Sequence, residues 1–306
     1  MSSALSTPRR VTILGAATSA GTHHAGQERA PDALRARGLV ARLEAAGLTV
    51  SDRGDVVRET FQVDRSGSAA RNQHAVVRAA RVVADAVERA AGQDKVLVVL
   101  GGDCTVSLGV LAGLQRREPQ TALVYFDGDA DLSVPGRGSG IMDAMGIAHL
   151  LGLAETGLTD LFATRPPVAP ARLAVLGYDE GDPDSFVPGV FDARPGLTHF
   201  PGPAVRADPE GCARAALAAT ASAPRLMVHF DVDAVDGGDL PLANFPHYGT
   251  GVSLAAAGQV LSVLLAAPQL AAVVLTEVNP SYDPDGDSIH RYLDTVAGAL
   301  SAGLAV

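Results

Sequence analysis

Acidic side chains gather directly after two apolar runs of the sequence. The run ALVYF leads into Asp127, Asp129 and Asp131, and the run LMVHF leads into Asp231 and Asp233. Because residues two apart in an extended chain project to the same side, each group presents its carboxylates together. Crowded carboxylates raise one another's pKa and oppose folding unless a counter-charge is present. Two such groups therefore indicate a site that binds cations.

A thiol joins these carboxylates through a third motif. The apolar run KVLVVL leads into GGDC, which ends at Cys104, and none of the 24 lysines and arginines lies inside the three motifs. Divalent cations are then the expected counter-charge, with Mg, Ca or Mn favoured by oxygen-rich sites. Five aspartates with one thiol suffice for two ions that share a carboxylate. The alternatives are surface turns for the aspartates and a small buried residue for Cys104; repetition of the pattern favours the metal site.

Short β-branched runs alternate with amphipathic runs rich in Ala and Arg along the chain. The expected strands are Val11–Gly15, Leu48–Ser51, Lys95–Leu100, Ala122–Phe126, Arg172–Leu176, Leu226–Phe230 and Ala272–Thr276. The expected helices are Pro31–Ala46, Ala69–Ala91, Thr105–Gln115, Met142–Leu151, Pro209–Thr220, Ser253–Ala266 and Ser288–Ala302. This alternation predicts an α/β fold with a parallel sheet covered on both faces, in which sites form beyond the carboxyl ends of the strands. A single domain over residues 1–306 is the simplest interpretation.

The composition narrows the class of protein. The chain has 306 residues, 47% of them apolar, which is enough for a sizeable core. Its net charge of −10 argues against a nucleic-acid partner. Cys104 and Cys212 do not suggest a disulfide framework, the first residues lack a signal-peptide pattern, and the most apolar stretch, Leu261–Leu275, is too short to span a membrane. We therefore expect a cytoplasmic protein with no membrane partner.

Taken in order, the three motifs resemble those of the ureohydrolase superfamily, which includes arginase, agmatinase and formiminoglutamase. GGDC, DGDAD and HFDVD stand where that family has GGDH, DAHxD and SxDxD, and the segments GQERAP and TEVNP extend the likeness to nearly the whole chain. The resemblance implies a three-layer αβα sandwich with an eight-stranded, mostly parallel sheet. It also implies two Mn2+ ions or another divalent metal, a small guanidino substrate and a homo-oligomer, often a trimer or hexamer.

The resemblance also implies site residues, by position. The implied metal ligands are Cys104, Asp127, Asp129, Asp131, Asp231 and Asp233, with Asp127 and Asp231 as bridging candidates. Glu277 matches the residue placed against the guanidinium group, and Asp131 would hold the nucleophile. Asp143 stands where arginases have a proton-shuttling histidine, with a helix N-cap as the alternative role. Candidate substrate contacts are Ser133, Ser139, Glu180 or Asp182, and the later loop residues Asn244, His247 and Tyr248.

Two departures from the family pattern set the functional hypotheses. Cys104 and Asp129 stand where the family has metal-binding histidines, so the six groups carry two more negative charges than the family's set. Such a site should hold cations tightly but leave bound water less acidic, which favours a more reactive substrate. The preferred hypothesis is an amidinohydrolase whose metal-bound hydroxide attacks a modified guanidine such as N-hydroxyarginine, releasing urea or a substituted urea. The alternative is a catalytically impaired relative that acts as a binding or regulatory subunit. A phosphate-transferring enzyme is weaker, since the sequence has no P-loop and no basic clamp.

Overall fold

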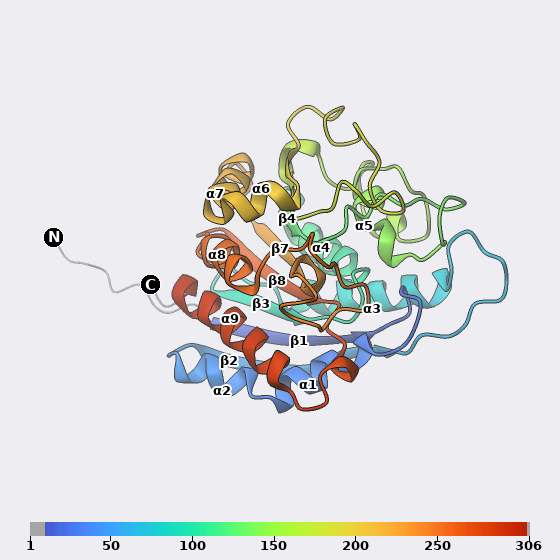
Figure 1. Cartoon of the computed structure of the whole chain (residues 1–306). Helices are drawn as coiled ribbons and strands as arrows, with labels where there is room; N and C mark the ends of the chain where they lie inside the picture. The colour runs from blue at the N-terminus through green and yellow to red at the C-terminus, as the bar shows by residue number, and fades with distance from the viewer. Residues whose placement is uncertain (1–9, 305–306) are drawn as a thin grey trace.

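Eight parallel strands form the centre of the molecule. A computed structural model describes residues 10–304, and residues 1–9 and 305–306 lie outside the described part. The N-terminal segment that is predicted to lack a signal peptide therefore begins outside the described residues. Within the described part, the sheet order is β2-β1-β3-β8-β7-β4-β5-β6, and every ladder between neighbouring strands is parallel (Figure 1). The strands are β1 (Arg10–Thr18), β2 (Thr49–Glu59), β3 (Lys95–Leu100), β4 (Ala122–Phe126), β5 (Leu173–Leu176), β6 (Thr198–Phe200), β7 (Leu226–Asp231) and β8 (Leu270–Thr276).

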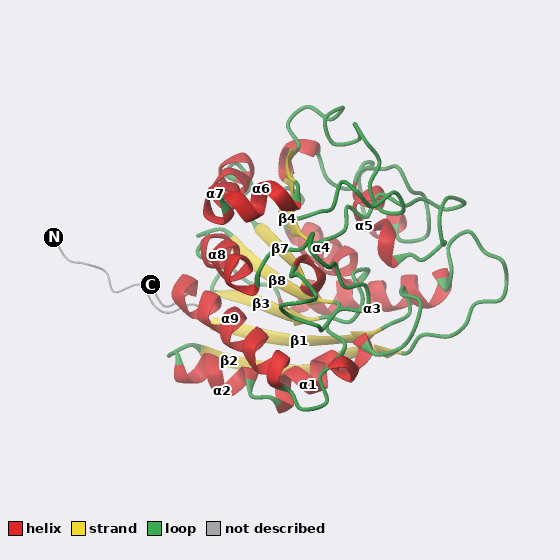
Figure 2. Ribbon diagram, in the orientation of Figure 1, coloured by secondary structure: helices red, strands yellow, loops and turns green. Residues whose placement is uncertain are grey.

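Helices cover both faces of this sheet (Figure 2). One hydrophobic core joins the sheet to α1 (Ala30–Ala36), α2 (Leu39–Ala45), α6 (Gly202–Ala207), α7 (Pro209–Thr220), α8 (Leu254–Leu265) and α9 (Asp287–Leu304). A second core joins it to α3 (Gln73–Ala90), α4 (Val106–Arg117) and α5 (Gly146–Leu150). The predicted three-layer αβα sandwich with an eight-stranded sheet is confirmed. Within residues 10–304, no helix combines the length and the apolar character needed to cross a membrane.

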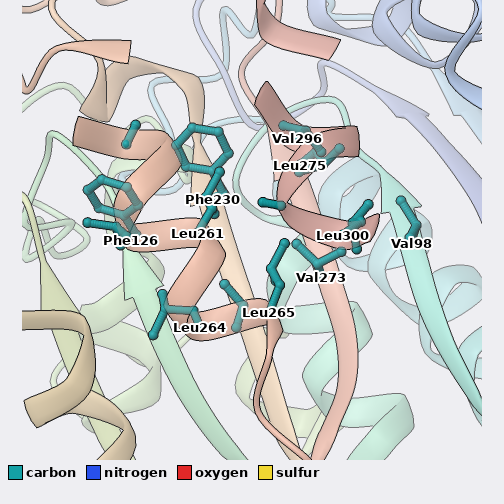
Figure 3. Packing of buried hydrophobic residues seen from close by; sticks show 14 of the residues in the cluster. Val98, Phe126, Phe230, Leu261, Leu264, Leu265, Val273, Leu275, Val296 and Leu300 are labelled. Carbon is teal, nitrogen blue, oxygen red and sulfur yellow. The ribbon is translucent and has the colours of Figure 1, made fainter. Parts of the chain in front are cut away.

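The unbroken apolar runs of the sequence are strands buried on both faces. In β3, Val96, Val98 and Leu100 pack into the first core, whereas Leu97 and Val99 pack into the second. Because successive side chains of a strand alternate between faces, a strand covered on both sides needs apolar residues throughout. Figure 3 shows the first core from close by, where α8 and α9 pack apolar side chains over the central strands. Each fully buried side chain of this kind contributes about 1.5–3 kcal/mol, before the entropy cost of folding.

Sequence periodicity predicts most elements but misses two and merges two others. β6 has only three residues, all half-buried, and α6 has six, so neither produces a clear apolar pattern. The prediction of one helix over Pro31–Ala46 is wrong, because Gly38 adopts a left-handed φ of 87° between α1 and α2. The predicted strand Leu48–Ser51 is too short, since β2 continues to Glu59 alongside β1.

Four central strands end side by side at one edge of the sheet. β3, β8, β7 and β4 are neighbours in that order and run in the same direction. The segments that follow them therefore meet at the carboxyl ends, although they are far apart in sequence. This arrangement brings together the GGDC turn, both acidic motifs and Glu277.

Candidate metal centre

The GGDC turn is held tightly against two other strands. The N–H of Gly101 donates to the carbonyl of Leu275 in β8 at 2.7 Å. A Cβ atom on Gly102 would overlap the carbonyl oxygen of Thr18 in β1, so no larger residue fits there without movement of the backbone. This close approach fixes the turn that buries the thiol of Cys104 at the start of α4.

The first acidic motif leaves β4 in a turn that Ser185 stabilises. The Ser185 hydroxyl accepts hydrogen bonds from the N–H groups of Ala130 at 2.7 Å and Asp131 at 2.9 Å. Asp131 adopts a left-handed φ of 48°, a strained conformation that is common where function fixes a side chain. Its carboxylate also accepts a 2.6 Å hydrogen bond from the Tyr125 hydroxyl. Sequence analysis misses Ser185, because nothing in its spacing links it to the acidic motif.

The second acidic motif contacts both of the others. The thiol of Cys104 donates to Asp231 at 2.6 Å, and the N–H of Gly128 donates to Asp233 at 2.9 Å. The hydroxyl of Thr276, the last residue of β8, lies 3.3 Å from Asp231. These contacts join the ends of four strands into one cluster.

All six predicted metal ligands line a single cavity of about 270 Å³. Five of the six have potential ligand atoms in compact groups, each with its members within 4.8 Å of one another, whereas Asp131 belongs to none of these groups. The groups are Cys104, Asp127, His229 and Asp231; Asp129, Asp233 and His247; and Cys104, Asp143 and Glu277. Asp127 and Asp231, the bridging candidates, belong to the same group, so the two strand ends converge rather than pointing apart.

Burial makes the cluster resist ionisation. Burial, and then the neighbouring carboxylates, raise the pKa of Asp127, Asp131 and Asp231 well above the ordinary value for aspartate. The thiol of Cys104 likewise has a raised pKa, because it is buried and faces Asp231. Within the described residues, no lysine or arginine forms an ion pair with the six predicted ligands; the ion pairs of these groups involve histidine.

One of these histidines is buried and supplies no counter-charge. His229 precedes Asp231 on the same face of β7 and stacks on Tyr125 with a ring-centroid distance of 3.8 Å. Its Nε2 atom lies 3.3 Å from Asp127 and 3.8 Å from the sulfur of Cys104. Burial lowers the pKa of His229 to about 3, so the imidazole is neutral. Sequence analysis misses this residue, although HFDVD departs from the family's SxDxD at this position.

The other histidine comes from the loop between β7 and α8. The Nε2 atom of His247 lies 3.7 Å from Asp129 and 4.0 Å from Asp233. Burial opposes protonation of His247, but the facing carboxylates outweigh burial and raise its pKa to about 9. The pKa of Asp233 is nevertheless raised to about 6, because burial acts on it more strongly than His247 does. None of the three loop residues predicted to contact the cavity, Asn244, His247 and Tyr248, is among its described lining residues, whereas Phe245 of the same loop is.

The predicted substrate contacts separate into two sets. Ser133, Ser139 and Asp182 line the cavity. Glu180 is exposed and is not among the described lining residues, so the structure does not bring it to the cavity. Of the predicted pair, only Asp182 lies on the cavity wall, together with Asp184 of the same loop.

Glu277 and Asp143 complete the cavity wall. Glu277 adopts a left-handed φ of 64°, and one of its carboxylate oxygens accepts a 2.8 Å hydrogen bond from buried Gln27, which the sequence analysis does not single out. Burial, and then the charge of Asp143, raise the pKa of Glu277 well above its ordinary value. The N-cap interpretation of Asp143 is wrong, because Met142 occupies the cap position and Asp143 accepts a 2.6 Å hydrogen bond from the N–H of Cys104.

Three buried polar atoms at this cluster have no hydrogen-bond partner among the described residues: Asp129 Oδ1, His247 Nε2 and Glu277 Oε1. An unpaired buried polar atom costs about 1–3 kcal/mol, so such atoms are expected to face a ligand. Carboxylates, a thiol and imidazoles are also the donors that divalent first-row cations take in proteins. The residues present therefore fit a divalent metal centre.

The protein is of the α/β class, with eight parallel strands between two helix layers and a buried polyacidic cavity at the ends of the central strands. The sequence model of the Arginase family matches residues 9–300, and the chain belongs to that family. The chain is 26% identical to an arginase from Brevibacillus brevis over 283 residues, covering 90% of this chain and 92% of that protein. It is 28% identical to an arginase from Bacillus caldovelox over 178 residues, covering 56% of this chain and only 60% of that protein.

Solved structures share the fold. The crystal structure of arginase from Bacillus subtilis superposes with a TM-score of 0.81 at 22% identity, covering 95% of this chain and 98% of that chain. The arginase of Entamoeba histolytica, solved with L-ornithine, gives a TM-score of 0.83 at 21% identity, covering 98% and 100%. Proclavaminate amidino hydrolase from Streptomyces clavuligerus gives 0.71 at 18% identity, covering 97% and 92%. At these identities the likeness shows the fold alone.

Proposed function

We propose that this protein is a metal-dependent amidinohydrolase that cleaves a C–N bond of a small guanidino substrate. The observation that carries the proposal is the convergence of six potential metal ligands and Glu277 on one cavity. One carboxylate oxygen of Glu277 is buried there without a hydrogen-bond partner among the described residues, as expected of a group that binds a cationic substrate. Membership of the Arginase family supports the same reaction class.

Two divalent cations, with Mn2+ as the expected metal, are held by Cys104, Asp127, Asp129, Asp131, Asp231 and Asp233 in this proposal. When bound, such a pair acts as a Lewis acid and lowers the pKa of a water molecule toward neutrality. The cations also supply the positive charge that the cluster lacks in protein side chains. With cations bound, the ionised form of each carboxylate becomes favourable, because each carboxylate then faces a cation rather than another carboxylate.

The side chains of the cavity bind the substrate, orient the attacking water and supply a proton to the leaving group in this proposal. Glu277, oriented by its hydrogen bond from Gln27, binds the guanidinium group through charge-assisted hydrogen bonds. Asp131, oriented by Tyr125, directs the attacking water. Asp143 has a raised pKa because it is buried, so it can hold a proton near neutral pH and deliver it to the leaving amine. Asp182 is placed on the cavity wall to bind the substrate tail.

A modified guanidine such as N-hydroxyarginine is the substrate we propose within this class. The carboxylate at Asp129 and the thiolate of Cys104 would give the bound metals more negative charge than imidazoles do, which leaves bound water less acidic. A hydroxyguanidine is less basic than guanidine, and this compensates for the weaker nucleophile. Urea or a substituted urea would be released.

The test is a panel of guanidino compounds incubated with Mn2+-loaded protein and assayed for urea or substituted urea. Turnover of one hydroxyguanidine, lowered about 10- to 150-fold in kcat/KM by Glu277→Gln, is the expected result, since a hydrogen bond to a charged group is worth about 1.5–3 kcal/mol. Replacement of exposed Glu180 by glutamine is the matched control and should leave kcat/KM unchanged. Loaded protein that releases no urea from any compound would refute the proposal.

A binding or regulatory subunit is the second candidate. It is favoured by the 2.6 Å hydrogen bond from Cys104 to Asp231, which lets the cluster store a proton instead of a cation. Elemental analysis separates the candidates, because metal content close to zero after growth with added manganese supports the second.

Both cysteines are free thiols, which supports the proposed cytoplasmic location. The trimeric or hexameric assembly stays a prediction.

A further inference from the structure

The DGDAD motif differs from the family's DAHxD at two adjacent positions, and the side chain of His247 lies against both. A Cβ atom on Gly128 would lie 2.6 Å from the backbone carbonyl oxygen of Asp233, and 2.6 Å from Cδ2 and 2.9 Å from Nε2 of His247. An alanine, as in the family pattern, would therefore crowd both the His247 ring and the backbone of Asp233. The next residue, Asp129, presents a carboxylate to the same ring at 3.7 Å. Gly128 thus leaves room for both the imidazole and the Asp233 backbone, and Asp129 faces the imidazole.

The backbone of the loop holds His247 in this place. The N–H of Gly237 donates to the carbonyl of His247 at 2.7 Å, and the N–H of Gly249 donates to the carboxylate of Asp236 at 2.5 Å. A Cβ atom on Gly237 would lie 2.7 Å from Cβ of Pro246, so the loop packs closely on the chain that leaves β7. The side chain of His247 is 13% exposed. Its position is therefore set by the fold rather than by free rotation in solvent.

The donor atoms around His247 are spaced for a shared ion rather than for hydrogen bonds. Nε2 lies 3.7 Å from Asp129 and 4.0 Å from Asp233, beyond hydrogen-bond distance. Two donors each about 2.1 Å from one ion are at most about 4.2 Å apart, and both distances fall within that limit. Nε2 and the facing Oδ1 of Asp129 are buried and lack hydrogen-bond partners among the described residues.

We infer that His247 is a metal ligand, and that Asp129, Asp233 and His247 together hold the second cation of the proposed centre. The imidazole that the family supplies from the DAHxD motif comes here from the loop between β7 and α8. This inference rests on the proposed dinuclear centre and names which chain segments build its second site. It makes the loop over residues 232–253 part of the metal centre rather than only a wall of the substrate cavity.

The experiment measures Mn2+ binding to the full chain, by equilibrium dialysis with elemental analysis and by low-temperature EPR. Wild-type protein should bind two ions per chain and show the spectrum of a spin-coupled pair. His247→Ala should retain one tight ion with an uncoupled six-line spectrum, and its second Kd should rise at least 100-fold. His290→Ala, which removes an exposed histidine from α9, is the matched control and should bind like wild type.

Two further variants test the same site, and the second of them guards against a simple folding defect. Gly128→Ala should lose the second ion as His247→Ala does, because the added Cβ crowds the His247 ring and the backbone carbonyl of Asp233, and both residues belong to the proposed site. The double variant Asp129→His/His247→Ala should regain two ions, because it returns the imidazole to the family's position. If wild-type protein and His247→Ala bind two ions with equal affinity, the inference is wrong while the proposed function stands. Wild-type protein that binds one ion also overturns the inference, and wild-type protein that binds none overturns the proposed centre as well. Two ions without urea release would count against the proposed reaction and leave the ligand assignment standing.

Discussion

Replacing Asp233 with asparagine should stabilise the metal-free protein while it weakens metal binding. Without a cation the pKa of Asp233 rises from 3.8 to about 6 on folding, mainly because the carboxyl is buried. A carboxyl whose pKa is raised by folding contributes stability below pH 4 and loses it as the pH rises through 6. The difference between 3.8 and about 6 corresponds to about 3 kcal/mol of lost stability at pH 8. Asparagine removes this penalty and still accepts the 2.9 Å hydrogen bond from the N–H of Gly128.

Urea unfolding in the presence of a chelator tests the argument. Asp233→Asn should exceed wild type in free energy of unfolding by about 3 kcal/mol at pH 8 and by only about 1 kcal/mol at pH 4.5. Saturating Mn2+ should reverse the order, because wild type then gains binding free energy that the variant has lost. Asp192→Asn, at a side chain that is 79% exposed, is the control and should shift stability by less than about 0.5 kcal/mol. A metal-free Asp233→Asn protein that is no more stable than wild type at pH 8 would refute the electrostatic account of the cluster.

Three other substitutions probe the positioning of the ligands. Cys104→Ser should abolish the sulfur-to-cobalt charge-transfer band that Co2+-loaded wild type is expected to show in near-ultraviolet absorption; an unchanged band would mean that the thiol does not bind metal. Gly102→Ala should lower the free energy of unfolding by about 1–3 kcal/mol or more, measured by urea denaturation, because its Cβ overlaps the carbonyl oxygen of Thr18. Ser185→Ala removes the acceptor of two backbone N–H groups, so it should cost about 1–3 kcal/mol and weaken Mn2+ binding; wild-type Mn2+ affinity in that variant would show that the turn after β4 holds its shape unaided.

The sheet could be predicted because its signal is local. Strands buried on both faces must be apolar throughout, so runs such as those of β3, β4 and β8 stand out in the sequence. The three residues of β6 are only half-buried, and they gain their strand conformation from pairing with β5 rather than from their own pattern. The break at Gly38 is hidden for a similar reason, since the apolar periodicity continues on both sides of it.

The carboxylates of the site could be predicted because they directly follow strands that end at one edge. Residues that approach these carboxylates from loops carry no such marker, and the sequence predicts His247 only as a substrate contact. His247 follows a segment without regular structure, and its distance from Asp129 depends on how the loop folds back over Gly128. Ser185 and Gln27 are found only once the backbone path is known, because they act through single hydrogen bonds from distant segments.

The order of strands in the sheet has a consequence for how the molecule assembles during synthesis. β3 and β4 leave the ribosome early, yet they never pair with each other, because β8 and β7 lie between them. The thiol that follows β3 and the carboxylates that follow β4 thus stay on separate halves until the last third of the chain inserts between those halves. Long-range pairing of this kind is slow, so nascent chains and C-terminally truncated fragments should capture manganese poorly. Metal loading of the proposed centre should therefore follow the insertion of β7 and β8 into the sheet.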